Sequence, residues 1–140
     1  MPSGPLMLAG RKAVCEALLV SGLKVDPQYH LFQNNTTPMS SDTLGSYTEA
    51  DFTGYASVNA VGWSAPVTSS GHEKTLATSV LFQVGSSPTV GNNIYGYYVT
   101  DNNRGGALVW AERFTGAPLS MTVAGDAIVV TPEFQESSEF

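Results

Sequence analysis

The sequence predicts an all-β protein: an antiparallel Greek-key sandwich of jelly-roll type, with a short helix at the N-terminus. Residues 94–114 place β-branched and aromatic side chains in two arms around a turn of Asp, Asn, Arg and Gly, which is typical of a hairpin. After Pro27, short apolar segments separated by turn residues recur about every 8 to 12 residues, as in sandwiches and barrels. Longer connections at 34–51 and 62–74 fit Greek-key crossings.

Residues 1–24 are predicted to form a helical arm. Ser3 and Pro5 supply a cap and a first-turn residue, residues 6–20 contain good helix formers, and Gly22 offers a left-handed stop. Charged residues interrupt the apolar run, so a secretory signal is not expected. The apolar side of this helix would cover the chain's own sheet, which we favour, or dock onto a partner.

Residues 25–132 are predicted to form the sandwich. Strands are expected at 29–33, at 52–61 and at 75–84. The last of these has the clearest alternation of apolar and polar side chains, which is typical of a half-buried antiparallel strand. The expected inward faces are Phe52, Ala56, Val58 and Ala60 in the second strand, and Leu76, Val80, Phe82 and Val84 in the third.

The end of the chain is predicted to hold a second hairpin and a tail. Residues 119–123 and 127–131 would pair through a tight turn, and Pro132 would end the second strand. Residues 133–140 contain three glutamates, two serines and two phenylalanines, which predicts a solvated acidic tail. The alternative is an arm that becomes ordered on a neighbouring subunit.

Composition argues against several classes of partner. Charged residues make up 13% of the chain, with 6 basic and 12 acidic residues and no basic cluster, so the long-range field would repel nucleic acid. No apolar run approaches the roughly 20 residues that cross a bilayer, so no membrane partner is expected. Cys15 is the single cysteine, and no Cys and His grouping has zinc spacing. Neither a metal nor another cofactor is predicted.

Two motifs come close to chemical sites, and neither is complete. Residues 62–66, Gly-Trp-Ser-Ala-Pro, imitate the start of a nucleophile elbow, but Pro66 replaces the last glycine and no helical pattern follows. His30 and His72 would be the only histidines available as a base. Residues 101–112 match four positions of a calcium loop, yet strands flank them and glycine stands at the fifth position. We therefore predict neither an enzyme nor a calcium site.

Glu112 and Arg113 are the most informative charges because they lie inside the aromatic hairpin. By strict alternation Glu112 would share a face with Leu108, Trp110 and Phe114, where an unpaired buried charge is costly. A bulge or an arginine of the same chain would resolve this cost; alternatively, the pair spans two subunits. The candidate interface residues are Asn102, Asn103, Arg104, Trp110, Glu112, Arg113 and Phe140.

Four segments carry a set of motifs: 31–38 (LFQNNTTP), 47–55 (YTEADFTGY), 94–101 (IYGYYVTD) and 110–114 (WAERF). As a set they resemble a family of small virion proteins of tailed bacteriophages, which includes jelly-roll cement proteins that decorate the head. The resemblance covers about residues 29–134. It implies a homodimer that binds the outside of the capsid near two-fold axes and clamps neighbouring major capsid subunits against internal DNA pressure. It assigns no contact residue.

The expected function is therefore that of a structural virion protein on the outer surface of the capsid. Its expected partners are the major capsid protein and a second copy of the chain. The alternative is a tail-associated receptor- or glycan-binding sandwich module. That module would use Tyr95, Tyr97 or Trp110 as a stacking platform.

Overall fold

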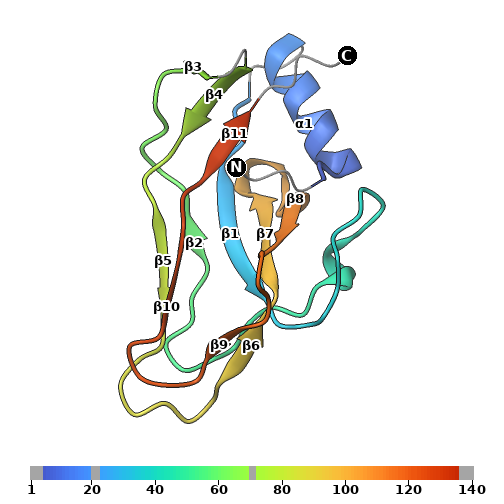
Figure 1. Cartoon of the computed structure of the whole chain (residues 1–140). Helices are drawn as coiled ribbons and strands as arrows, with labels where there is room; N and C mark the ends of the chain where they lie inside the picture. The colour runs from blue at the N-terminus through green and yellow to red at the C-terminus, as the bar shows by residue number, and fades with distance from the viewer. Residues whose placement is uncertain (1–4, 20–22, 70–71, 136–140) are drawn as a thin grey trace.

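The computed structural model describes residues 5–19, 23–69 and 72–135, and most regular structure in them is β-strand (Figure 1). Among these residues, no helix has the length and apolar character needed to cross a bilayer. The elements are α1 (Leu8–Leu19), β1 (Pro27–Phe32), η1 (Leu44–Ser46), β2 (Val58–Asn59), β3 (Val67–Ser69), β4 (His72–Leu76), β5 (Val80–Gln83), β6 (Asn92–Ile94), β7 (Gly96–Asp101), η2 (Asn102–Arg104), β8 (Ala107–Arg113), β9 (Leu119–Met121), β10 (Ala127–Val130) and β11 (Glu133–Gln135).

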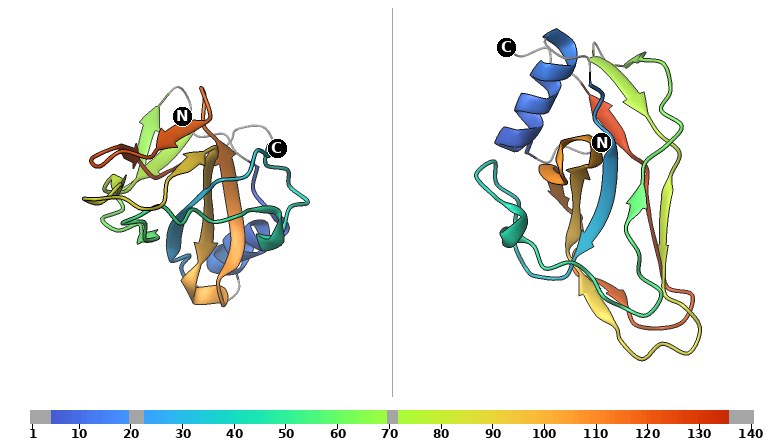
Figure 2. Two further views of the ribbon diagram at one scale, coloured as in Figure 1. Left: turned by 90° about the horizontal axis from the view of Figure 1, so that it is seen from below. Right: turned by 180° about the vertical axis from the view of Figure 1, so that it is seen from behind.

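The strands form two facing layers, seen in Figures 1 and 2. The larger sheet has the order β2-β1-β7-β8, and the β10-β5 pair lies opposite it. The β11-β4-β3 sheet continues the second layer at one end of the molecule, and the β6-β9 pair lies at the other end. Every strand pair among the described residues is antiparallel. This arrangement confirms the predicted all-β class.

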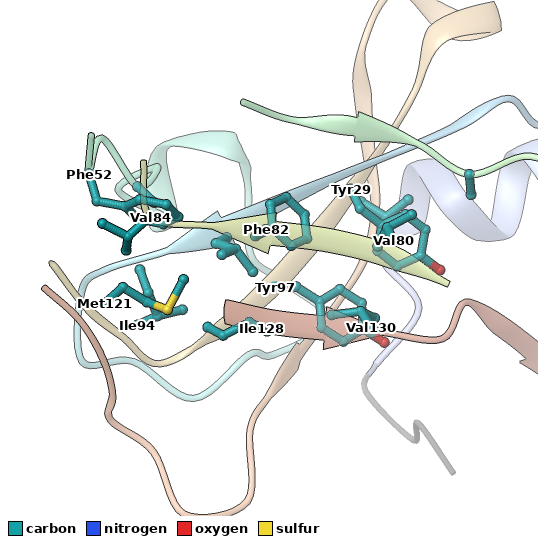
Figure 3. Packing of buried hydrophobic residues seen from close by; sticks show 14 of the residues in the cluster. Tyr29, Phe52, Val80, Phe82, Val84, Ile94, Tyr97, Met121, Ile128 and Val130 are labelled. Carbon is teal, nitrogen blue, oxygen red and sulfur yellow. The ribbon is translucent and has the colours of Figure 1, made fainter. Parts of the chain in front are cut away.

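The main core fills the space between the two layers (Figure 3). Tyr29 of β1 stacks on Tyr97 of β7 with ring centroids 5.3 Å apart, and both rings are buried. From the opposite layer, Val80 and Phe82 point into the same space. Each such side chain contributes about 1.5–3 kcal/mol of transfer free energy. Aromatic and aliphatic side chains from both layers therefore form one continuous core.

The helix packs on the chain's own sheet, which confirms the favoured alternative. Just before α1, the Met7 N–H donates to the Val109 carbonyl of β8 at 2.9 Å. Gly10 lies so close to β8 that a Cβ there would be 2.3 Å from the Val109 oxygen. The predicted cap Ser3 and the predicted stop Gly22 lie outside the described residues.

The prediction of a continuous strand over 52–61 was wrong. Only Val58 and Asn59 pair with β1. Before them the chain turns at Gly54, which has φ +91° and lies against Gly85. A Cβ added to Gly54 would lie 2.8 Å from the Gly85 nitrogen. As a result, Ala56 is exposed and does not face the core. Tight glycine packing outweighed the local alternation.

The expected strand at 75–84 is divided into two strands that belong to different sheets. Val80, Phe82 and Val84 are buried as predicted. Between β4 and β5, however, the Ala77 N–H donates to the Pro132 carbonyl and the Thr78 N–H donates to the Val61 carbonyl. These bonds bend the chain between the two sheets.

The predicted second hairpin was wrong in its pairing. β9 pairs with β6, and β10 pairs with β5. A turn does lie between β9 and β10, because the Asp126 side chain accepts hydrogen bonds from the backbone N–H groups of Thr122 and Val123 at 3.1 and 2.9 Å. The two strands on either side of that turn belong to different sheets, so the expected tight hairpin does not form.

The first part of the predicted acidic tail is a strand. Glu133, Phe134 and Gln135 form β11 and pair with Leu76, Thr75 and Lys74 of β4. The expected boundary at residue 132 was therefore wrong. Residues 136–140, including the candidate contact Phe140, lie outside the described residues.

Candidate functional site

The tip of the β7–β8 hairpin is tied to the chain by the residues predicted as contacts. Asp101 is completely buried and accepts hydrogen bonds from the Asp26 N–H at 3.0 Å, the Asn103 N–H at 2.9 Å and the Arg104 guanidinium at 2.7 Å. Arg104 also donates to the Leu23 carbonyl at 2.7 Å. The Asp101 carboxylate faces N–H donors, an arrangement that does not suit a calcium ligand.

Asn102 and Asn103 remain exposed at the tip. The Asn102 side chain donates to Asn59 at 3.1 Å, and the Asn103 side chain donates to the Lys24 carbonyl at 2.9 Å. The predicted contact residues of the tip therefore make hydrogen bonds within the chain, and two of them are also exposed.

A bulge in β8 determines which way Glu112 and Arg113 point. Val99 of β7 lies opposite Trp110, whereas Thr100 lies opposite Leu108, so Val109 is an extra residue in the ladder. The bulge places Leu108 on the face that carries the helix, and Trp110 and Glu112 on the face that meets the second layer. The predicted grouping of Glu112 with Leu108 was wrong, while the expected bulge is present.

Glu112 lies opposite Tyr97 at the border of the core. Burial raises the pKa of Tyr97 and of Tyr29, and the negative charge of Glu112 raises both further. Glu112 also lines a groove of about 300 Å³ between the end of β8 and β10. The other lining residues are Tyr97, Arg113, Phe114, Thr115, Val129, Val130 and Thr131.

Arg113 makes its described contacts on the other face, within the same chain. Its guanidinium donates to the Asn35 side chain at 2.8 Å and to the Thr36 carbonyl at 3.0 Å. It also lies over the Tyr95 ring, 5.2 Å from the centroid. Arg113 thus anchors the loop after β1.

The three rings of the expected glycan platform do not share one surface. Tyr97 is buried between the layers, and Trp110 meets Tyr29 edge to face with centroids 6.1 Å apart. Tyr95 belongs to the cluster on the helix side. A sugar ring could not stack on all three.

The serine of the elbow-like motif has a structural role. The Leu76 N–H donates to the Ser64 Oγ at 3.2 Å, and the Ser64 N–H donates to the Leu76 carbonyl at 2.7 Å. Ser64 therefore extends the β4 pairing and does not occupy a strand-to-helix turn.

A side-chain network on the outer face of β1 was missed by the sequence analysis. His30 Nδ1 lies 2.8 Å from Glu49 Oε2, and His30 Nε2 lies 2.8 Å from Thr100 Oγ1. The Tyr55 hydroxyl donates to the same Glu49 oxygen at 2.6 Å, and Tyr98 stacks on His30 with centroids 4.7 Å apart. No sequence motif signals this network because its members come from four separate segments.

The order of hydroxyl, imidazole and carboxylate in this network is that of a catalytic triad. Thr100 is buried, however, and its hydroxyl belongs to the packed surface between β1 and β8. A nucleophile needs access to a substrate carbonyl and nearby donors for the oxyanion. The arrangement supports the sheet and the crossing after β1.

The network predicts acid sensitivity. Burial opposes the charge of Glu49, but hydrogen bonds from Tyr55 and His30 outweigh it and lower the pKa of the carboxyl. A lowered folded-state pKa stabilises the protein above the unfolded pKa, and this stabilisation is lost as pH falls through the folded value. Glu49→Gln should cost about 1 kcal/mol at pH 7, since the carboxylate is partly exposed.

Thermal unfolding followed by circular dichroism between pH 7 and pH 3 tests this prediction. Below pH 4 the curves of the wild type and Glu49→Gln should converge, while Glu73→Gln, a variant of an exposed acid on β4, should follow the wild type throughout. A constant difference between wild type and Glu49→Gln at every pH would contradict the assigned role.

The outer face of the β5–β10 pair exposes apolar side chains. Leu81 and Val129 lie directly opposite each other, and they are 53% and 62% exposed. On each strand they alternate with buried residues, so they are not needed for the core. Sequence alternation predicts that position 81 faces outward, but only the pairing with β10 shows that a second apolar residue adjoins it.

Comparison with protein-family models, with curated proteins and with solved structures gave no match.

Proposed function

We propose that this protein is a jelly-roll cement protein of a phage head, a homodimer that binds the outer capsid surface and clamps neighbouring major capsid subunits. The observation that supports it most directly is the exposed Leu81–Val129 pair on a sandwich whose core is already complete. Adjoining apolar side chains on a small surface favour contact with another protein. The motif resemblance is the reason for proposing the capsid subunit as that protein.

The role is structural and not catalytic. The His30 network has a buried hydroxyl, and the Ser64 hydroxyl accepts a backbone hydrogen bond. The polar tip at Asn102 and Asn103 offers a rim of hydrogen-bonding groups, as interfaces usually have around an apolar centre. Repetition over an icosahedral shell adds avidity when one molecule bridges two subunits.

Sedimentation of the purified protein with empty expanded heads tests the proposal. The wild type should bind saturably, and Leu81→Glu should weaken binding by about tenfold or more because a charge would be desolvated in the contact. Met39→Glu is the matched control, since Met39 is also 60% exposed but lies in the crossing between β1 and β2 and not on the β5–β10 pair.

Both variants should melt within about 3 °C of the wild type, because surface substitutions seldom change stability by more than about 0.5 kcal/mol. Absence of wild-type binding to heads would reject the proposed function. Equal binding by Leu81→Glu and the wild type would reject this face as the contact.

A further inference from the structure

A second groove, of about 620 Å³, lies between the start of α1 and the crossing that contains η1, and we call it the helix-side groove. Met7 and Leu108, which are buried in the smaller core cluster, line its floor. Leu8 and Leu44 line its two walls, and they are 63% and 49% exposed. A groove with exposed apolar walls suits the binding of a peptide segment that brings an apolar side chain.

Hydrogen bonds hold both walls of the helix-side groove in place. On the helix wall, the Met7 N–H donates to the Val109 carbonyl of β8 at 2.9 Å. On the η1 wall, the Asp42 carboxylate accepts from the Met39 N–H at 2.9 Å and from the Tyr47 hydroxyl at 2.7 Å, and Tyr47 is itself buried. Because the walls are anchored in this way, the groove does not have to be ordered by its ligand, which lowers the cost of binding.

The two walls of the groove differ in charge. Arg11 and Lys12 are exposed, and they follow Leu8 by three and four positions on α1, so the three side chains are neighbours on the helix surface. They are the only two adjacent cations in a chain with a net charge of −6. Asp42 lines the η1 wall. An acidic ligand is therefore favoured when its carboxylates lie along the helix wall, away from Asp42.

The chain contains a segment with this chemistry. Residues 136–140, Glu-Ser-Ser-Glu-Phe, follow β11 directly and lie outside the described residues. Phe140 offers a large apolar side chain for the floor of the groove, and Glu136 and Glu139 offer carboxylates for the helix wall. The segment and the groove are thus complementary in both apolar character and charge.

The direction of β11 favours the groove of a second copy over that of the same chain. Figure 1 and the right-hand view of Figure 2 show β11 running toward the end of the molecule where α1 ends, whereas the groove lies where α1 begins. Five extended residues span at most about 18 Å. A helix of 12 residues, such as α1, is itself about 18 Å long. The tail of the same chain would use its whole reach to return along α1, with nothing left for the reversal of direction.

We infer that residues 136–140 of each copy bind the helix-side groove of the other copy, with the aromatic ring between the apolar walls and the glutamates along the helix wall. The inference rests on the proposed function for the homodimer itself. A two-fold symmetric dimer makes this contact twice, and the second contact forms at the high effective concentration that the first one sets. The exchanged tails therefore hold the dimer together on the helix side, and the β5–β10 face contacts the capsid.

Sedimentation velocity over a concentration series tests the exchanged tails on the full chain. The wild type should pass from a monomer of 14.8 kDa to a dimer as its concentration rises. Lys12→Glu and Phe140→Ser should each raise the dimer dissociation constant about tenfold or more, because each dimer loses the contact twice. Lys24→Glu is the matched control, since Lys24 is exposed but does not line the groove, and its constant should stay within about twofold of the wild type. A monomeric wild type, or unchanged association of Lys12→Glu and Phe140→Ser, overturns the inference.

An exchange of charges shows whether the tail binds a second copy. Arg11→Glu with Lys12→Glu reverses the charge of the groove, and Glu136→Lys with Glu139→Lys reverses the charge of the tail. Each double variant alone should associate at least about tenfold more weakly than the wild type, because like charges meet. An equimolar mixture should form a heterodimer, since an acidic groove then meets a basic tail and a basic groove meets an acidic tail. A mixture that remains monomeric overturns the inference.

NMR of the side-chain methyl groups locates the contact. On dimerisation the Leu44 signals should shift, whereas those of Leu81 and Val129 should not. Shifts confined to Leu81 and Val129 would place the second copy on the β5–β10 face and overturn the inference. Nuclear Overhauser contacts from Leu44 to residues 1–4 or 136–140 in the dilute monomer would also overturn it, since the chain would then fill its own groove.

Two outcomes separate this inference from the proposed function. The variants change exposed positions or residues 136–140, so they should melt within about 3 °C of the wild type, and a lost dimer then reports the contact and not the fold. A tail-dependent dimer that does not bind heads supports the inference and rejects the capsid subunit as partner. A protein that binds heads but forms no tail-dependent dimer overturns the inference and leaves the proposed capsid contact standing.

Discussion

Gly96→Ala should lower the melting temperature by about 10 °C or more, with a loss of about 3 kcal/mol in the free energy of unfolding. Gly96 is the first residue of β7 and is buried between two other segments. A Cβ at this position would lie 2.1 Å from the Glu112 carbonyl oxygen and 2.6 Å from the Phe32 ring. The first of these atoms belongs to the backbone of β8, so relief of the clash requires the two strands to separate.

Urea unfolding and thermal melting of Gly96→Ala measure this cost. Gly45→Ala is the control, because the nearest atom to a new Cβ there is the Thr43 side-chain oxygen at 3.7 Å. That substitution should change the free energy of unfolding by no more than about 1 kcal/mol, in the stabilising direction if the backbone angles suit alanine. A melting temperature of Gly96→Ala within about 2 °C of the wild type would show that β7 and β8 are less tightly paired than described.

Asp101→Ala should cost about 3–5 kcal/mol, because it removes the buried carboxylate that holds the hairpin tip. The backbone N–H groups of Asp26 and Asn103 would lose their acceptor, and the Arg104 guanidinium would lose its buried counter-ion. Asp101→Asn should cost less, about 1–2 kcal/mol, since an amide oxygen still accepts from the backbone.

A double-mutant cycle separates the ion pair from the other contacts. Asp101→Ala combined with Arg104→Ala should cost at least about 1 kcal/mol less than the sum of the two single losses. Chemical denaturation of the four proteins gives the required free energies. Additive losses would show that Asp101 acts through the backbone donors alone.

Local sequence predicted the parts of the fold that depend on neighbouring residues. The β7–β8 hairpin was confirmed because its arms favour strands and its turn contains Gly105 and Gly106, both with positive φ. The inward face of β5 was also confirmed, since Val80 and Phe82 follow a period of two. The prediction that the helix covers the chain's own sheet was also confirmed, because α1 packs on β8.

The candidate site was predicted less well, because orientation depends on non-local pairing. Strict alternation places Glu112 on the same face of β8 as Leu108. The extra residue Val109 shifts the alternation, so Leu108 lies on the opposite face from Glu112. Arg113 was expected to pair with a carboxylate, whereas its described hydrogen-bond partners are Asn35 and the Thr36 carbonyl, 78 and 77 positions away. No pattern in the sequence predicted which residues line the groove opposite β8.

By itself, the sequence determined the all-β class, the aromatic hairpin and the scarcity of charge, since these follow from propensity, period and composition. The tertiary structure alone decided that β9 and β10 pair with different strands, and that residues 133–135 form β11 where a tail was expected. It also decided that His30 contacts Glu49, which is 19 positions away in the sequence. The physical reason is that a strand's partner is selected by how a whole layer packs and satisfies its backbone hydrogen bonds. That choice depends on residues far along the chain, which no local pattern records.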